Sequence, residues 1–156
     1  MASPVLRVYW DTSVFLSFIN SATEAQRHHV CVDILKHAKE GKVVICTSTF
    51  TIAEVVRPKG TAHPLPLSPQ EVSDLNGMFQ WPWVKKYQVD ENVAMRAAKI
   101  ARDTNLKPAD SIHVATAIAA ACDVLQRWDR DFDKVKSLIR VEDPVLISPV
   151  GLFDPV

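Results

Sequence analysis

The chain has 156 residues, 47% of them hydrophobic and 23% charged, and this composition predicts a single globular domain over residues 1–156. With 18 basic and 18 acidic residues the formal net charge is zero, which argues against a protein that binds nucleic acid through a bulk excess of positive charge. The three cysteines show no zinc-binding spacing, and no apolar run resembles a signal peptide or a membrane span. We therefore expect a cytoplasmic protein without a membrane partner.

Short apolar runs alternate with helical patterns through the first half of the chain. Gly41 ends the second helical pattern, and Pro58 ends the third. In chain order we predict a strand over 5–10, helices over 12–19 and 22–40, a strand over 43–47, a helix from Ser48 or Thr49 to about Arg57, and a loop over 58–69.

The second half of the chain continues the alternation. The predicted elements are a helix over 69–79, a strand over 83–89, a helix from Asp90 that breaks at 105–108, an apolar helix over 109–121, a strand over 123–127, and a last strand over 138–141 or 145–147. This alternation predicts an α/β fold with a mostly parallel sheet. Such sheets bind ligands beyond the carboxyl ends of their strands.

Acidic residues stand in four separate elements of this scheme. They are Asp11 after the first strand, Glu54 inside the third helix, Asp110 at the start of the apolar helix, and Asp129 beyond the strand over 123–127. Each also has a structural interpretation, as a helix cap, a first-turn acid, a surface pair with Arg57 or a solvated turn. His113, one turn after Asp110, is predicted to be a hydrogen-bonding support rather than a ligand.

The four carboxylates predict a metal site if the fold brings them together, because close carboxylates repel and a divalent cation removes that cost. Ligation by oxygen alone favours Mg²⁺ or Mn²⁺ over zinc. Such ions polarise phosphoryl oxygens and lower the pKa of bound water. The set therefore predicts phosphodiester hydrolysis by in-line attack of a metal-bound water, with Asp11 and Asp110 holding the principal metal.

From Val8 to Phe132 the chain resembles the PIN domain, and within it the VapC-type toxin ribonucleases. The matching motifs are Asp11-Thr12-Ser13, Ile52-Ala53-Glu54-Val55, the segment over 106–117, and Asp129-Arg130-Asp131-Phe132. The segment over 106–117 is the most specific of the four.

The resemblance implies a three-layer α/β/α sandwich and a Mg²⁺ (or Mn²⁺) site formed by Asp11, Glu54, Asp110 and Asp129. It also implies an RNA substrate, a small antitoxin partner and a homodimer, since many relatives dimerise and are held inactive by an antitoxin. In family terms Ser13 is the polar support near the metal, and Asp131 is an auxiliary acid.

The chain departs from the family at Arg127, where a Thr or Ser usually stands two residues before the fourth acid. This leaves Asp131 as a substitute for Asp129. Arg127 either contacts a substrate phosphate or forms a surface salt bridge. Arg57 and Arg130 are further candidate substrate contacts.

Basic and aromatic residues elsewhere allow other substrate contacts. Lys59, Lys85 and Lys86 could draw in the substrate or be simply solvated. The segment 81–83, with two tryptophans, could stack bases, or it could be core packing or a contact with a partner chain.

Two other functions compete with a nuclease. An aspartyl-phosphate phosphohydrolase would need a second Asp two residues after Asp11, and Ser13 stands there. A non-catalytic PIN-fold module would bind a partner without cleaving RNA, and the presence of all four acids argues against it.

Overall fold

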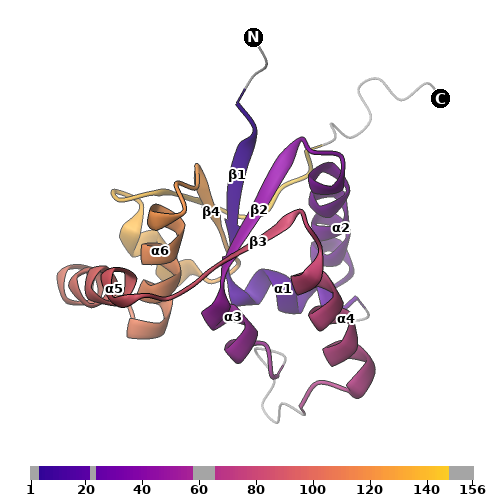
Figure 1. Ribbon diagram of the computed structural model, residues 1–156, viewed down its shortest axis with the longest axis horizontal. Coiled ribbons are helices and arrows are strands. Elements are labelled where there is room, and N and C mark those ends of the chain that lie inside the picture. The colour runs from indigo at the N-terminus through magenta and orange to yellow at the C-terminus, as the bar shows by residue number, and fades with distance from the viewer. Residues whose placement is uncertain (1–3, 22–23, 58–65, 148–156) are drawn as a thin grey trace.

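The computed structural model describes residues 4–21, 24–57 and 66–147, which form a five-stranded sheet between two helical layers (Figure 1). The strands pair in parallel throughout, in the order β3-β2-β1-β4-β5. They are β1 (Leu6–Trp10), β2 (Val43–Ser48), β3 (Val84–Tyr87), β4 (Val124–Gln126) and β5 (Arg140–Glu142). The predicted three-layer α/β/α fold is confirmed.

The helices divide between the two faces of the sheet. One face is covered by α1 (Thr12–Ile19), α2 (Ala25–Lys39) and α4 (Pro69–Gln80), and the other by α5 (Glu91–Thr104) and α6 (Pro108–Ala119). Two short elements, α3 (Thr49–Glu54) and the 3₁₀ helix η1 (Arg130–Val135), follow β2 and β4.

The alternation of side chains along β1 explains the two layers. Val8 and Trp10 enter the core under α1, α2 and α4, whereas Tyr9 points into the core under α5 and α6. Each of these three side chains is at most 1% exposed. Because both faces of β1 are buried, its sequence is a continuous apolar run rather than an alternating one.

The carboxyl edge of the sheet, at the bottom of Figure 1, is where helices begin. Four residues at this edge cap the element that follows: Asp11 caps α1, Ser48 caps α3, Asp90 caps α5 and Asp129 caps η1. In each case the side-chain oxygen accepts a backbone N–H of the first turn, which stabilises the helix start. The chain thereby gathers polar side chains at one edge.

The predicted elements differ from the structure mainly at their ends. α3 ends at Glu54 rather than near Arg57, and the last strand is Arg140–Glu142, which overlaps the first of the two predicted alternatives. The predicted loop over 58–69 falls largely on residues 58–65, which lie outside the described residues, as do residues 148–156 of the predicted single domain. That one domain spans 1–156 stays a prediction.

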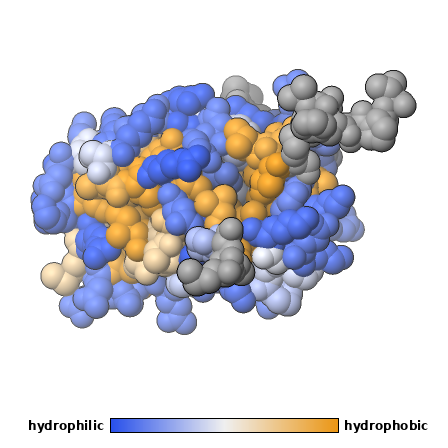
Figure 2. Space-filling view, turned by 90° about the horizontal axis from the view of Figure 1, so that it is seen from above, coloured by the Kyte–Doolittle hydropathy of each residue, from blue (hydrophilic) through white to orange (hydrophobic). Residues whose placement is uncertain are grey.

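Cys31 and Cys46 are buried in the core. Within the described ranges, no helix has both the length and the apolar character that crossing a bilayer requires. Seen from the amino edge of the sheet, apolar patches alternate with polar side chains on the surface (Figure 2).

Candidate metal centre and active site

The strand order reverses between β1 and β4, because the chain runs from β1 outward to β2 and β3, and from β4 outward to β5. Open parallel sheets bind ligands outside the carboxyl ends at such a point. The backbone N–H of Asp11 donates to the carbonyl oxygen of Gln126 at 3.4 Å, which joins the carboxyl ends of β1 and β4 at this point. The topology alone thus selects the region around Asp11 and the segment after β4.

Three carboxylates meet in this region. Asp110 in the first turn of α6, Asp129 beyond β4 and Asp131 in η1 each offer a ligand oxygen, and these atoms lie within 4.8 Å of one another. Asp110 is buried and the other two are partly buried. A group of oxygen donors this close fits a hard divalent cation such as Mg²⁺ or Mn²⁺, which would offset the mutual repulsion of the carboxylates.

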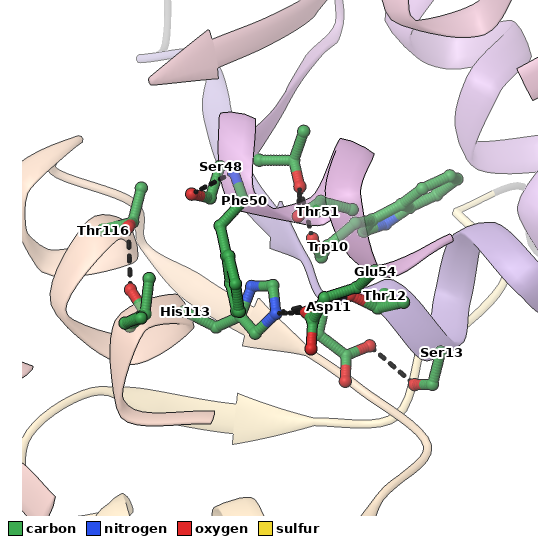
Figure 3. Close-up of polar contacts among 12 residues, drawn as sticks. Trp10, Asp11, Thr12, Ser13, Ser48, Phe50, Thr51, Glu54, His113 and Thr116 are labelled. Atoms are coloured by element: carbon green, nitrogen blue, oxygen red, sulfur yellow. Dashed lines mark hydrogen bonds and ion pairs between the residues drawn. The ribbon is translucent and has the colours of Figure 1, made fainter. Parts of the chain in front are cut away.

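Asp11 is buried, at 1% exposure, and is held in a fixed orientation. Its Oδ1 accepts a hydrogen bond from the Ser13 hydroxyl at 2.6 Å and one from the Val14 backbone N–H at 3.3 Å (Figure 3). The Ser13 hydroxyl also accepts the Trp128 N–H at 3.2 Å. Ser13 therefore connects the end of β1 with the segment after β4.

Glu54 is held by two side chains from other elements (Figure 3). Its Oε1 accepts hydrogen bonds from the Thr12 hydroxyl at 2.6 Å and from Nε2 of His113 at 2.5 Å. The other ring nitrogen of His113, Nδ1, lies 2.7 Å from the Tyr9 hydroxyl. His113 thus stands between a buried tyrosine and Glu54, the supporting position that the sequence predicted.

The burial of Tyr9 sets the direction of the hydrogen bonds that run from Tyr9 through His113 to Glu54. Burial raises the pKa of Tyr9 well above its ordinary value of 10.0, so its hydroxyl keeps its proton. The Tyr9 hydroxyl can therefore donate to Nδ1 of His113, whose Nε2 then carries the hydrogen that Oε1 of Glu54 accepts.

The predicted site acids all lie at the carboxyl edge, but the closest group differs from the predicted four. Asp131, predicted as an auxiliary acid or a substitute, joins Asp110 and Asp129 in that group. Asp11 and Glu54 are not members of it. Each of those two is anchored by its own hydrogen bonds to neighbouring side chains.

Arg127 forms salt bridges, the second of the two alternatives that the sequence left open, although the arginine itself is buried. Its side chain is only 1% exposed, and its two terminal nitrogens pair with Asp133 and Asp143, each at 2.5 Å. The pairing with Arg127 lowers the pKa of Asp133 below its ordinary value of 3.8. A guanidinium so buried and engaged does not reach a substrate phosphate, and its ion pairs are buried on the arginine side rather than at the surface.

The other two candidate arginines are exposed. Arg130 in η1 has a side chain that is 69% exposed and pairs with Asp143 at 3.2 Å. Arg57 lies three residues after Glu54, just beyond the end of α3. Both positions lie on segments that follow the carboxyl edge, so both remain candidate substrate contacts.

The two tryptophans of segment 81–83 lie far from this edge, because they come just before β3 and hence at the amino edge of the sheet. Trp81 and Trp83 pack on each other with ring centroids 5.4 Å apart and contact the core. The amine of Lys86 donates to the carbonyl oxygen of Phe79. These contacts agree with the packing alternative rather than with base stacking at the site.

Sequence reasoning did not single out three residues that complete the site. Thr12 and Tyr9 fix Glu54 and His113, and Trp128 binds Ser13. Thr12 carried a signal, since it lies between two predicted site residues in one motif. Tyr9 looked like any apolar strand residue, because its partner is 104 positions away.

Comparison with known proteins identifies the family. The model of the PIN domain matches residues 8–138, which include all the acids described above. The chain belongs to the PIN domain family. No curated protein sequence matches this PIN domain.

Solved structures share its fold. VapBC2 from Rickettsia felis, bound to a DNA fragment from its promoter, aligns over 88% of this PIN domain and 98% of that chain, with 14% identity and a TM-score of 0.63. DNA-bound VapBC from Salmonella typhimurium aligns over 90% and 100%, with 17% identity and a TM-score of 0.61. VapC20 from Mycobacterium tuberculosis, a toxin that cleaves the sarcin–ricin loop, aligns over 81% and 92%, with 17% identity and a TM-score of 0.59. At these identities the likeness concerns the fold.

Proposed function

We propose that this PIN-domain protein is a metal-dependent ribonuclease that hydrolyses RNA phosphodiesters and serves as the toxin of a toxin–antitoxin pair. The observation that carries the proposal is the convergence of Asp110, Asp129 and Asp131 within 4.8 Å, at the reversal point of the sheet. An RNA substrate would place the activity in the cytoplasm.

In this proposal three of the carboxylates bind the metal, and Glu54 handles a proton. Asp110, Asp129 and Asp131 would hold Mg²⁺ or Mn²⁺, and Asp11 lies beside them at the end of β1. A bound dication supplies charge that polarises a phosphoryl oxygen and stabilises the leaving oxygen. In-line attack by water that breaks the bond from phosphorus to the 3′ oxygen would give 5′-phosphate and 3′-hydroxyl ends, with the 3′ oxygen taking up a proton.

Glu54 has the contacts of a proton-handling group. Its Oε1 is fixed by Thr12 and His113, so its carboxylate keeps one orientation. A carboxylate held in this way can orient a water molecule for attack on phosphorus and accept its proton.

The toxin role is supported by the kind of proteins that share the fold. The structures from Rickettsia felis and Salmonella typhimurium are complexes named VapBC, and VapC20 is named as a toxin that cleaves the sarcin–ricin loop. We carry over from them an RNA substrate and a small antitoxin. A homodimer is proposed on the family resemblance alone.

An apolar groove of about 430 Å³ offers a surface for the antitoxin. It lies beside α2 on the helical face away from α5 and α6. Its lining combines aromatic and aliphatic side chains with two lysines: Phe18, Val32, Leu35, Lys36, Lys39, Trp81 and Trp83. An amphipathic antitoxin helix with acidic residues beside its apolar face would match this composition.

The proposal is tested by incubating the protein with a mixed RNA pool and Mn²⁺, and by mapping the ends of the products. We expect cleavage that EDTA abolishes, with 5′-phosphate ends. Asp110→Asn should lower the rate roughly a hundredfold or more, because it removes charge from the metal group. Asp103→Asn is the matched control, since Asp103 pairs with Lys99 on the exposed face of α5.

Two results would contradict the proposal. One is a parent protein that binds Mn²⁺ but leaves RNA intact, which would favour a non-catalytic binding module. The other is an Asp110→Asn variant that cleaves RNA as fast as the parent.

A further inference from the structure

A second cavity lies against the segment that carries Asp129 and Asp131. It has a volume of about 610 Å³ and lies between the first half of α2 and the segments that follow β4 and β5. Arg27, Trp128, Arg130 and Asp143 line it together with apolar side chains. This volume is within the range of about 300–1,000 Å³ that is usual for small-ligand sites.

The cavity is continuous in sequence with the metal group. Trp128 immediately precedes Asp129, and Arg130 stands between Asp129 and Asp131. The backbone N–H of Trp128 donates to Ser13, whose hydroxyl donates to Asp11. A ligand in this cavity would therefore contact the two residues that flank Asp129 in the sequence.

Trp128 forms a fixed wall of the cavity. Its indole N–H donates to the Ser17 hydroxyl at 3.0 Å, which anchors the ring to α1. The guanidinium carbon of Arg27 lies over this ring, 4.6 Å from its centroid. A guanidinium stacked on an aromatic ring keeps the N–H groups at its edge available for hydrogen bonds, and it is preorganised for binding a planar or bidentate anion.

Two arginines, Arg27 and Arg130, line the cavity together with one acid, Asp143. Arg27 pairs with Glu24 at 3.0 Å, and Arg130 pairs with Asp143 at 3.2 Å. Both pairs lie at the surface, where such pairs contribute about 0–1 kcal/mol and exchange readily for a phosphate. Asp143 also pairs with the buried Arg127 at 2.5 Å, a shorter contact than the one it makes with Arg130.

We infer that this cavity is a substrate subsite that binds a nucleotide of single-stranded RNA next to the cleaved bond, with Arg27 and Arg130 contacting its phosphate. The inference rests on the proposed ribonuclease function. The apolar part of the lining, including Val30 and Pro144, would contact the ribose and base. Arg27 comes from α2, far in sequence from every predicted site residue, so the subsite exists only in the folded chain.

The test measures RNA binding separately from cleavage. Fluorescence anisotropy of a labelled single-stranded RNA in EDTA gives the Kd and its salt dependence for Arg27→Ala, Arg27→Gln, Arg130→Ala and the control Arg102→Ala. Arg102 is an exposed arginine on α5, on the opposite side of the sheet. Steady-state cleavage in Mn²⁺ gives kcat and KM for the same proteins.

We expect each subsite variant to weaken RNA binding and raise KM about tenfold while kcat stays near that of the parent, because a charge-assisted contact to phosphate is lost. The slope of log K against log salt should fall by about 0.7 for each phosphate contact removed. Arg102→Ala should change neither quantity.

Parent-like Kd and salt slope in folded Arg27→Gln and Arg130→Ala proteins would overturn the subsite, even if the parent cleaves RNA. Conversely, if these variants lose RNA binding while the parent never cleaves RNA, the subsite stands and the ribonuclease proposal fails.

Discussion

Single residues at the carboxyl edge serve the helix and the site at once. Asp11 caps α1 and Asp129 caps η1, and both also lie where the acids gather. From sequence, the alternative to metal binding was a helix cap for Asp11 and a solvated turn for Asp129. The structure makes capping and metal binding compatible, because a capping carboxylate is oriented by the backbone N–H groups it accepts.

The two roles of Asp11 can be separated by substitution. Asn caps a helix about as well as Asp, so Asp11→Asn should keep the free energy of unfolding within about 0.5 kcal/mol while RNA cleavage is lost. Asp11→Ala should lose cleavage and also about 1 kcal/mol of stability. Urea unfolding and the cleavage assay measure the two effects. Equal stability of the Asn and Ala variants would show that the cap contributes nothing.

The site residues that sequence predicted are those whose own chemistry is visible in one segment. Carboxylates after apolar strands could be found in this way, and so could His113 one turn after Asp110. Thr12 could not be assigned to Glu54, because the two lie 42 positions apart and only the fold joins them. The burial of Arg127 could not be predicted for the same reason, since its partner Asp143 lies 16 positions further along the chain.

At the scale of elements, Arg127 fastens the end of β4 to η1 and to the segment after β5. Its guanidinium is buried, whereas Asp133 and Asp143 have side chains that are 36% and 39% exposed. Removing the partly exposed Asp143 therefore leaves a buried cation with one partner fewer. Removing Arg127 itself leaves two acids that water can solvate.

This asymmetry gives an order of stabilities. Asp143→Ala should lower the free energy of unfolding by about 1–3 kcal/mol, and Arg127→Met by less, since methionine fills much of the same volume without a charge. Chemical denaturation of both variants and of the parent measures the order. A larger loss for Arg127→Met would mean that the ion pairs themselves, rather than the cost of an unpaired buried cation, stabilise this corner.

Elements with strong local sequence signals, such as α1, were predictable, whereas β5, which has the weakest signal, was not. α1 was predicted with its observed bounds, because an acidic cap precedes it and an apolar pattern fills it. β5 is only three residues long, Arg140–Glu142, and is a strand because β4 offers it a partner. The two short runs over 138–141 and 145–147 were therefore indistinguishable from sequence, and only the first overlaps a strand of the sheet.

At the scale of the whole molecule, metal binding by the acid group would make stability depend on the metal concentration. A dication that binds the folded chain alone stabilises it by RT ln(1 + [L]/Kd), which is about 2.7 kcal/mol at a hundred times Kd. We expect Mn²⁺ to raise the Tm of the parent and EDTA to reverse the rise. Asp131→Asn should reduce this shift and Asp103→Asn should not, as thermal unfolding at several Mn²⁺ concentrations would measure. A metal shift that survives in Asp131→Asn would remove that residue from the site.

The two outermost strands limit how copies of the chain can associate. β3 carries Lys85 and Lys86, and β5 carries Arg140 and Glu142, so each open border of the sheet is charged. Joining two copies through β3 would bring lysines against lysines, an arrangement by which natural sheets resist fibre-like growth. A homodimer of this chain would accordingly not be joined through β3.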